Sequence, residues 1–466
     1  MFATIIDWLN TALYSYVLII LLILGGIYFT VRTRFAQFRL LGKQFKAVTE
    51  KNGSGVSSFQ ALMVSTASRV GTGNIIGVAT ALCVGGFGSV FWMWVIAIIG
   101  GATAFVESTL AQIYKKRGKD GCYGGPAYYI EAAFKGKKGV AILFTVFLIL
   151  TYGIGFNMLA SYNLQSTFST YSFYNADITP WIIGFVIAAL VCYCLMGGGK
   201  RIVSVTGVLV PIMGALYILV ALVLVILNAK MLPDVFRQIF VGAFDFRAIF
   251  GGFGGSCVMY GIKRGLFSNE AGVGSAPNAA ASADIDHPVK QGLVQTLSVF
   301  IDTIVVCTAT AFMCMTSGVT PPTTSAEAAS YVQASLSVTL GGVGPIFITA
   351  AMVLFAFTTL LGNLFYVDKA INYLLGKEPT KLVRNICYVV ASLVIFVGAG
   401  LSADMLWNIA DVLMGGMTII NIPVILYLGK YAYRALRDYE RKSAEGLKMT
   451  FRKKDIGLTD ETDYWN

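Results

Sequence analysis

Long apolar runs separated by short polar loops dominate the chain. Each run is about as long as a helix that crosses the hydrocarbon core of a bilayer, roughly 20 residues. The runs are continuous rather than alternating, so they favour helices over the strands of a membrane barrel. They predict an all-α integral membrane protein with eleven spans, near residues 14–31, 57–84, 89–114, 140–168, 180–196, 202–227, 249–267, 293–315, 346–366, 386–398 and 405–428. Two further segments, 123–131 and 325–340, look amphipathic rather than spanning.

The second run is interrupted by polar residues and glycines between Ser65 and Gly77. Gly71 and Gly73 flank Thr72, and a helix is weakest where glycines cluster. A span can unwind at membrane depth only where its backbone faces protein or water. The unwound end of one half-helix offers carbonyls to a cation, and the start of the other offers amides to an anion. The alternative is an unbroken glycine-rich helix that packs closely against a neighbour.

The seventh run has a second glycine cluster at residues 251–255, five spans further along. Because five is odd, two sets of five spans cross the membrane in opposite senses. Interrupted spans at corresponding positions of two inverted halves indicate the binding site of a secondary transporter. We therefore expect an N-terminal span and loop (1–56), a first five-span repeat (57–228), a second, inverted one (229–430) and a cytoplasmic tail (431–466).

Composition and charge agree with a membrane protein. The chain is 56% hydrophobic and 13% charged, and soluble domains carry roughly twice that charged share. The net charge of +11 does not indicate nucleic-acid binding, because the basic residues lie in loops, as the positive-inside rule expects. Their distribution predicts a multi-pass protein of a bacterial- or archaeal-type plasma membrane, with the N-terminus outside and a polar, loosely ordered C-terminal tail inside.

Ionisable residues within apolar runs are costly and are candidates for function. Asp302 lies deepest in its run, and it is either a structural partner or part of the coupling machinery. Arg69 needs a carboxylate partner, and the candidates for this ion pair are Asp302 and Glu107. We expect Glu107 at the water interface, together with Asp368 and Lys369. Asp411 in the eleventh span, the hydroxyl pair Thr358 and Thr359 in the ninth, and the single His287, read as a turn residue, complete the candidates.

Motifs of enzymes are missing from the sequence. It has no phosphate-binding loop, no metal-spaced set of His and Cys, and no nucleophile elbow. The run 268–277 superficially resembles a nucleotide-binding loop but lacks a preceding strand, so we interpret it as an intracellular turn. We therefore expect neither catalysis nor an organic cofactor.

Six ordered stretches resemble the alanine or glycine:cation symporter family. They are ASRVGTGNIIGVATA (67–81), FWMWV (91–95), GGPAYYIE (124–131), RGLFSNEAGVGSAP (264–277), DHPVKQGLVQ (286–295) and LFAFTTLLG (354–362). The resemblance implies the leucine-transporter type of five-plus-five inverted fold, here with one extra N-terminal span. It also implies that sodium and an amino acid bind at the breaks of the second and seventh spans.

The resemblance to this family implies two sets of site residues. The sodium ligands are expected to be carbonyls near Ala67 and Val70 with the hydroxyls of Thr358 and Thr359. The amino acid is expected to contact Gly71, Thr72, Gly73, Asn74, Ala160, Gly254, Thr359 and Asn363.

Two of these positions depart from the family pattern. Ala160 stands where the family usually has a glutamine, and Asn363 where it usually has a tryptophan. Unless Phe156 or Tyr162 refills the space, the pocket is larger and more polar than usual, which favours glutamine, asparagine or serine over glycine as substrate.

The leading hypothesis is a sodium-coupled amino-acid symporter that works by alternating access. Its partners would be a free amino acid, sodium and membrane lipid, and no nucleic acid. The alternative is a membrane channel or sensor that binds an amino acid without coupled transport. A channel usually carries oligomeric filters or charged rings, and a sensor needs a signalling domain, for which the tail is too short.

Overall fold

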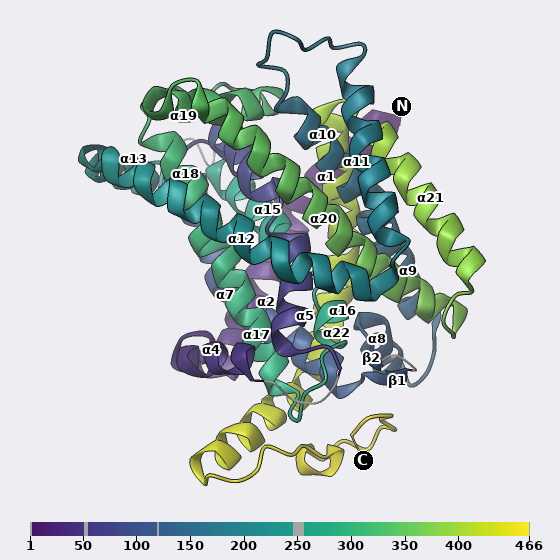
Figure 1. Ribbon diagram of the computed structural model, residues 1–466. Coiled ribbons are helices and arrows are strands. Elements are labelled where there is room, and N and C mark those ends of the chain that lie inside the picture. Colours follow the sequence, from purple (N-terminus) through teal and green to yellow (C-terminus); the bar gives the residue numbers. More distant parts are fainter. Residues whose placement is uncertain (1, 51–54, 119–120, 246–255, 466) are drawn as a thin grey trace.

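The fold was examined in a computed structural model, which describes residues 2–50, 55–118, 121–245 and 256–465. The chain is predominantly helical (Figure 1). Within these ranges, eight helices are long and apolar enough to cross a membrane, or nine if one bent pair counts as a span. The eight are Thr4–Arg32, Ser89–Ile113, Gly139–Ser166, Gly198–Leu227, Val289–Met315, Val343–Leu375, Lys381–Gly398 and Ala403–Ala444. The bent pair joins Ser58–Arg69 to Gly73–Gly85 at an angle of 50°.

The nine spans consist of one to four helical segments each. The first comprises α1 (Phe2–Ala12), the π-helical η1 (Leu13–Val17) and α2 (Leu18–Arg32). The others are α5 (Ser58–Arg69) with η2 (Gly73–Gly77), α6 (Val78–Thr80) and η3 (Ala81–Gly85); α7 (Ser89–Ile113); α9 (Gly139–Leu148), η4 (Ile149–Gly155) and α10 (Phe156–Ser166); α12 (Gly198–Leu227); α17 (Val289–Val299), η7 (Phe300–Cys307) and α18 (Thr308–Met315); α20 (Val343–Leu375); α21 (Lys381–Gly398); and α22 (Ala403–Ala444).

The remaining helical elements are shorter. They are α3 (Ala36–Arg39), α4 (Leu41–Thr49), α8 (Pro126–Ala133), α11 (Thr179–Leu195), η5 (Ala229–Met231), α13 (Leu232–Ala243), α15 (Cys257–Asn269), α16 (Pro277–Ala280), η8 (Ser325–Glu327), α19 (Ala328–Leu340) and η9 (Lys453–Ile456). Strands β1 (Lys116–Gly118) and β2 (Gly121–Tyr123) form an antiparallel hairpin in which Lys116 lies opposite Tyr123.

Nine of the eleven expected spans overlap the eight helices and the bent pair. The fifth overlaps α11, which at 17 residues is shorter than a full span. The seventh overlaps α15, and its expected glycine break at 251–255 lies outside the described residues. The expected count of eleven therefore stays a prediction, while the helical class and the break in the second span are confirmed.

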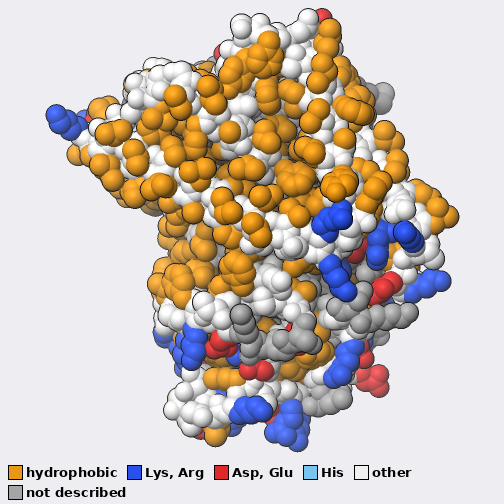
Figure 2. Space-filling model, in the orientation of Figure 1, with side chains coloured by type: hydrophobic (Ala, Val, Ile, Leu, Met, Phe, Trp, Pro, Cys, Tyr) orange, Lys and Arg blue, Asp and Glu red, His pale blue; other side chains and the backbone are white. Residues whose placement is uncertain are grey.

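The helices divide into an inner and an outer group. In α7 and the span Val289–Met315, 67% and 61% of the most apolar window is buried, against 28% in α12 and 22% in α21. The outer helices expose apolar side chains, and Figure 2 shows one face that is mostly hydrophobic in its upper part. On the same face, charged side chains gather toward the lower end, where α4 and the C-terminal segment lie (Figures 1 and 2).

The segment that follows α22 is packed, although the sequence predicted a loosely ordered tail. It folds back beneath the bundle (Figure 1). Phe451, Ile456, Leu458 and Trp465 are all at most 5% exposed. The expectation was wrong because four apolar side chains spaced through a polar tail are enough to bury it against a neighbouring surface.

Candidate functional site

The candidate site lies at the break in the second span. Helix α5 begins with a capping box, in which Ser57 and Gln60 satisfy each other's backbone amides. It ends at Arg69, and Val70 leaves helical geometry with ψ of 86°. Helical structure resumes at Gly73. The glycines thus interrupt the span where the sequence predicted.

The break leaves two carbonyls without their helical donors. In a continuous helix, the amides of Gly71 and Asn74 would donate to the carbonyls of Ala67 and Val70. Here the Gly71 amide donates to Asn74 Oδ1 at 2.8 Å, and the Asn74 amide donates to the Gly71 carbonyl at 3.1 Å. Both expected backbone ligands for sodium, Ala67 and Val70, are therefore released from the helical ladder.

Helix α20 lies directly against this break. A Cβ atom at Gly71 would lie 1.9 Å from Thr359 Oγ1, and one at Gly362 would lie 2.6 Å from the Ser68 amide nitrogen. Only glycine permits so close an approach at these two positions. As a result, the Thr359 hydroxyl is held against the opened turn of α5.

The two neighbouring threonines of α20 differ in their surroundings. Thr358 Oγ1 donates to the Leu354 carbonyl at 2.9 Å, the usual bond of a hydroxyl to its own helix. Thr359 Oγ1 is buried and has no hydrogen-bond partner among the described residues. An unpaired buried oxygen beside released carbonyls suits a small cation, so Thr359 fits a ligand role better than Thr358.

Asn74 and Asp302 join the second and eighth spans. Asn74 Nδ2 donates to Asp302 Oδ1 at 2.7 Å and to Ser268 Oγ at 3.0 Å. Asp302 Oδ2 accepts from Ser268 Oγ at 2.6 Å and from Thr303 Oγ1 at 2.8 Å. Asp302 lies in the π-helical stretch η7, and such stretches are frequent at functional sites.

The predicted ion pair of Arg69 is wrong. Within the described ranges, no carboxylate oxygen lies within salt-bridge distance of its guanidinium; instead Nη1 donates to Gln295 Oε1 at 3.1 Å. Asn74, on the other side of the bend, takes the position at Asp302 that the prediction gave to Arg69.

The segment between α15 and α16 is a turn, as the sequence predicted, and it is buried near α5. It contains Glu270, Gly272 and Gly274, whose φ angles of 54°, 88° and 87° are left-handed. Glu270 Oε1 lies 3.1 Å from Ser68 Oγ, and Oε2 accepts from Ser275 Oγ at 2.6 Å. The sequence did not indicate this burial, which the structure explains by hydrogen bonds from the polar side chains to the protein interior.

Three asparagines surround the break from α10 and α20. Asn363 Oδ1 lies 2.7 Å from Ser68 Oγ, and its Nδ2 donates to Asn157 Oδ1 at 3.0 Å. Asn163 Nδ2 donates to Thr72 Oγ1 at 3.2 Å. Ala160 lies three residues from both Asn157 and Asn163, on the same helical face. The two positions that depart from the family pattern therefore both lie near the break.

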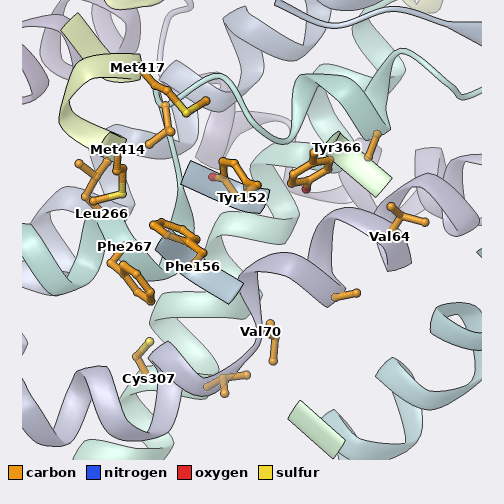
Figure 3. Packing of buried hydrophobic residues seen from close by; sticks show 14 of the residues in the cluster. Val64, Val70, Tyr152, Phe156, Leu266, Phe267, Cys307, Tyr366, Met414 and Met417 are labelled. Atoms are coloured by element: carbon orange, nitrogen blue, oxygen red, sulfur yellow. The ribbon is translucent and has the colours of Figure 1, made fainter. Parts of the chain in front are cut away.

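Aromatic rings fill the space on the other side. A Cβ atom at Gly73 would lie 2.7 Å from the Phe267 ring. The Phe156 and Phe267 ring centroids are 4.5 Å apart, and Trp407 lies 4.9 Å from Phe267. Figure 3 shows Phe156 and Phe267 side by side, with Tyr152 close by. Phe267 thus occupies the space next to Gly73, and Phe156 packs against Phe267.

The remaining acidic candidates are mainly structural. Glu107 is fully buried and not at the interface: it accepts from Asn421 Nδ2 at 2.9 Å and from the Gly272 amide at 3.3 Å. Asp411 pairs with Lys263 at 2.9 Å and Arg264 at 2.8 Å.

Of the remaining candidate residues from the sequence, one lies near the surface, one is buried and one is not described. Asp368 is partly exposed and lies near Lys369 and Arg384, as expected for an interface residue. His287 is buried in the loop before α17 and contacts Asp438. Gly254 lies outside the described residues.

Sequence reasoning missed four polar residues of this site: Ser68, Asn157, Asn163 and Glu270. Each lies in or beside an apolar run, and that position was the available signal. Their contacts depend on which helices pack together, and periodicity alone does not reveal that.

Comparisons with known proteins agree with these observations. The family model described as "Sodium:alanine symporter family" matches residues 1–453. The amino-acid carrier protein AlsT of Bacillus subtilis is 40% identical over 100% of this chain and 98% of its own length. The probable sodium/glutamine symporter GlnT of Bacillus subtilis is 41% identical over 95% of this chain and 92% of its length. The sodium/alanine symporter AgcS of Methanococcus maripaludis is 38% identical over 95% of this chain and 100% of its length.

Proposed function

Because the chain belongs to the sodium:alanine symporter family, and is therefore a multi-pass transporter and not an enzyme, we propose that it imports a neutral amino acid driven by sodium and works by alternating access. The observation that carries the proposal is the opened turn of α5. There the carbonyls of Ala67 and Val70 lack their helical donors, and the unpaired Thr359 hydroxyl lies against Gly71 in the same turn. The channel or sensor alternative gains no support from family membership.

We propose that sodium binds between α5 and α20. Its ligands would be the Ala67 and Val70 carbonyls and the Thr359 hydroxyl, since unwound carbonyls are typical sodium ligands in transporters. Thr358 is a weaker candidate, because its hydroxyl is bonded back to Leu354. The proposed ligands come from two elements, α5 and α20, so binding of sodium would join them.

The amino-acid carboxylate is proposed to bind at the start of the second half-helix. The first amides of a helix have no intrahelical acceptor and carry the positive end of its dipole. Thr72 and Gly73 supply such amides. Gly71 and Asn74 belong to the same turn, but the Gly71 amide is bonded to Asn74 Oδ1, so these two residues are proposed to shape the turn.

The substrate side chain is proposed to lie toward Ala160 and Asn363. Asn157 Nδ2 and Asn163 Oδ1 are buried without a partner among the described residues, and a polar substrate would supply one. We therefore favour glutamine, asparagine or serine over glycine. One relative is named as a probable sodium/glutamine symporter and another as a sodium/alanine symporter, so both kinds of substrate are included in the test below.

The proposed architecture is an eleven-span protein with two inverted five-span repeats after an extra first span. The charged end in Figure 2 would face the cytoplasm, because basic loops are retained there. We therefore propose that the tail lies inside and the N-terminus outside. Accessibility of single cysteines in loops, labelled from each side, tests the orientation.

A panel of amino acids in a thermal-shift assay tests the proposed substrate directly. A ligand that binds only the folded state raises the melting temperature. We expect glutamine, asparagine or serine to stabilise the purified protein in sodium and to do so less in potassium. Stabilisation that is equal in both salts would contradict sodium coupling.

A further inference from the structure

The last six described residues, 460–465, bind to a defined surface at one end of α7. Trp465 Nε1 donates to the Gln112 carbonyl at 2.7 Å, and the ring is 5% exposed. Tyr464 OH donates to Asp284 Oδ1 at 2.7 Å. The Lys115 ammonium lies 3.8 Å from the Tyr464 ring centroid, within cation–π distance.

Two aspartates complete this contact. Asp460 Oδ2 accepts from Tyr114 OH at 2.8 Å, and Asp463 Oδ2 accepts from the Arg117 amide at 2.8 Å. The segment is therefore bound by its acidic and its aromatic side chains, through specific partners on the opposite surface.

The same surface holds the residues just before α5 and just after α16. Gln112 Nε2 donates to the Ala283 carbonyl at 3.0 Å, just beyond α16. The Asp284 amide donates to the Val56 carbonyl at 2.8 Å, and Val56 immediately precedes the cap of α5. Residues 460–465 thus bind a surface that connects α5 and α16 to the inner helix α7.

We propose that Gln112, Lys115 and Asp284 form a binding site for an acidic, aromatic peptide, here residues 460–465 of the same chain, and that its occupation keeps α5 and α16 closed against α7. The binding site itself does not depend on the transport activity. The effect on gating rests on the proposed function.

A native cysteine reports occupancy of this site. Cys122 in β2 is partly buried, and burial raises the pKa of its thiol. Its interaction partners include Tyr464 and Lys115, the residues that the docked segment brings together. Release of residues 460–465 removes the Tyr464 side chain from this thiol and leaves it more accessible, so we expect it to react faster with a thiol reagent.

The test compares maleimide labelling of Cys122 in the purified full chain, quantified by mass spectrometry of its peptide. Trp465→Ala removes the buried anchor and is expected to raise the labelling rate about tenfold. Thr459→Ala, at an exposed position of the same tail, is the matched control and is expected to change nothing. A synthetic peptide of residues 456–465 added to Trp465→Ala should restore protection, and the same peptide carrying Trp465→Ala should not.

Unchanged labelling in Trp465→Ala, or equal protection by both peptides, would overturn the binding site. For the gating step, amino-acid efflux from vesicles should be faster in Trp465→Ala than in the control. Increased labelling with unchanged efflux would overturn the gating role while leaving the binding site. Failure of sodium-coupled transport in the unaltered chain would show as absent uptake with normal labelling changes, so the two failures are distinguishable.

Discussion

At the scale of single residues, the account rests on one hydroxyl. Thr359 Oγ1 is buried, lacks a partner among the described residues and faces the turn at Gly71. Its neighbour Thr358 has the same side chain but is bonded to Leu354. This pair provides an internal control within one helix.

Thr359→Val keeps the volume of the side chain and removes the oxygen. We expect the sodium concentration for half-maximal uptake to rise about tenfold, because losing one polar ligand costs roughly 1–2 kcal/mol. Thr358→Val should leave it within about twofold. Equal effects of the two variants on sodium dependence would place the ion elsewhere.

Asn363 is the residue whose change should alter specificity. Asn363→Leu retains a similar size but removes the amide that reaches Ser68 and Asn157. We expect the ratio of glutamine to alanine uptake to fall about tenfold, since a site built for polar groups discriminates strongly. Asn363→Trp should move the preference further toward alanine and glycine. Wild-type protein that takes up alanine well and ignores every larger polar amino acid would refute this assignment.

Residue identity was easier to predict from the sequence than residue partnership. Thr359, Asn74 and Asp302 stood out as polar residues in apolar runs, and Asn363 as a departure from the family pattern; all four lie at or near the break. The proposed Arg69–Asp302 pair did not form, because Asn74 occupies that carboxylate. A partner depends on side-chain direction after the bend, which no spacing in the sequence specifies.

At the scale of elements, close packing of α20 on α5 fixes the geometry of the proposed sodium site. Gly362 permits this packing, since a Cβ atom there would lie 2.6 Å from the Ser68 amide nitrogen. The helices must separate slightly to accept any side chain. That separation would move Thr359 away from the released carbonyls.

Gly362→Ala should therefore weaken sodium dependence and destabilise the fold by about 1–3 kcal/mol, the usual cost of overpacking. Gly214→Ala in the outer helix α12 is the control, because its Cβ atom would meet no heavy atom within 4 Å. Melting temperature and sodium titration of both variants provide the measurement. A Gly362→Ala protein that behaves like the Gly214→Ala protein would show that the contact is not needed.

The elements themselves were predicted unevenly. Glycines around Thr72 correctly indicated the break in the second span, since weak helix propensity acts locally. The turn that contains Glu270 and Gly272 was predicted, but its burial was not, because a polar glycine-rich run has the same composition whether it is exposed or buried. Its burial depends on Ser68, Glu107 and Asn421, which come from three other elements.

At the scale of the whole molecule, buried inner helices carry the site and exposed apolar helices surround it. The charged end, the hairpin β1–β2 and the packed tail all lie away from the mainly hydrophobic part of the surface (Figures 1 and 2). Continuous apolar runs were sufficient to predict this class of protein. The docking of the tail was not predictable, because it depends on the contact of Trp465 with the end of α7.

The central claim is that amino-acid movement is driven by sodium through this chain. The most direct measurement is uptake of radiolabelled glutamine, asparagine, serine and alanine into vesicles that contain the purified protein. An inward sodium gradient should drive accumulation above the equilibrium level for at least one of these, and collapse of the gradient should abolish it. Uptake that stops at equilibrium and is the same with and without the sodium gradient would contradict the account.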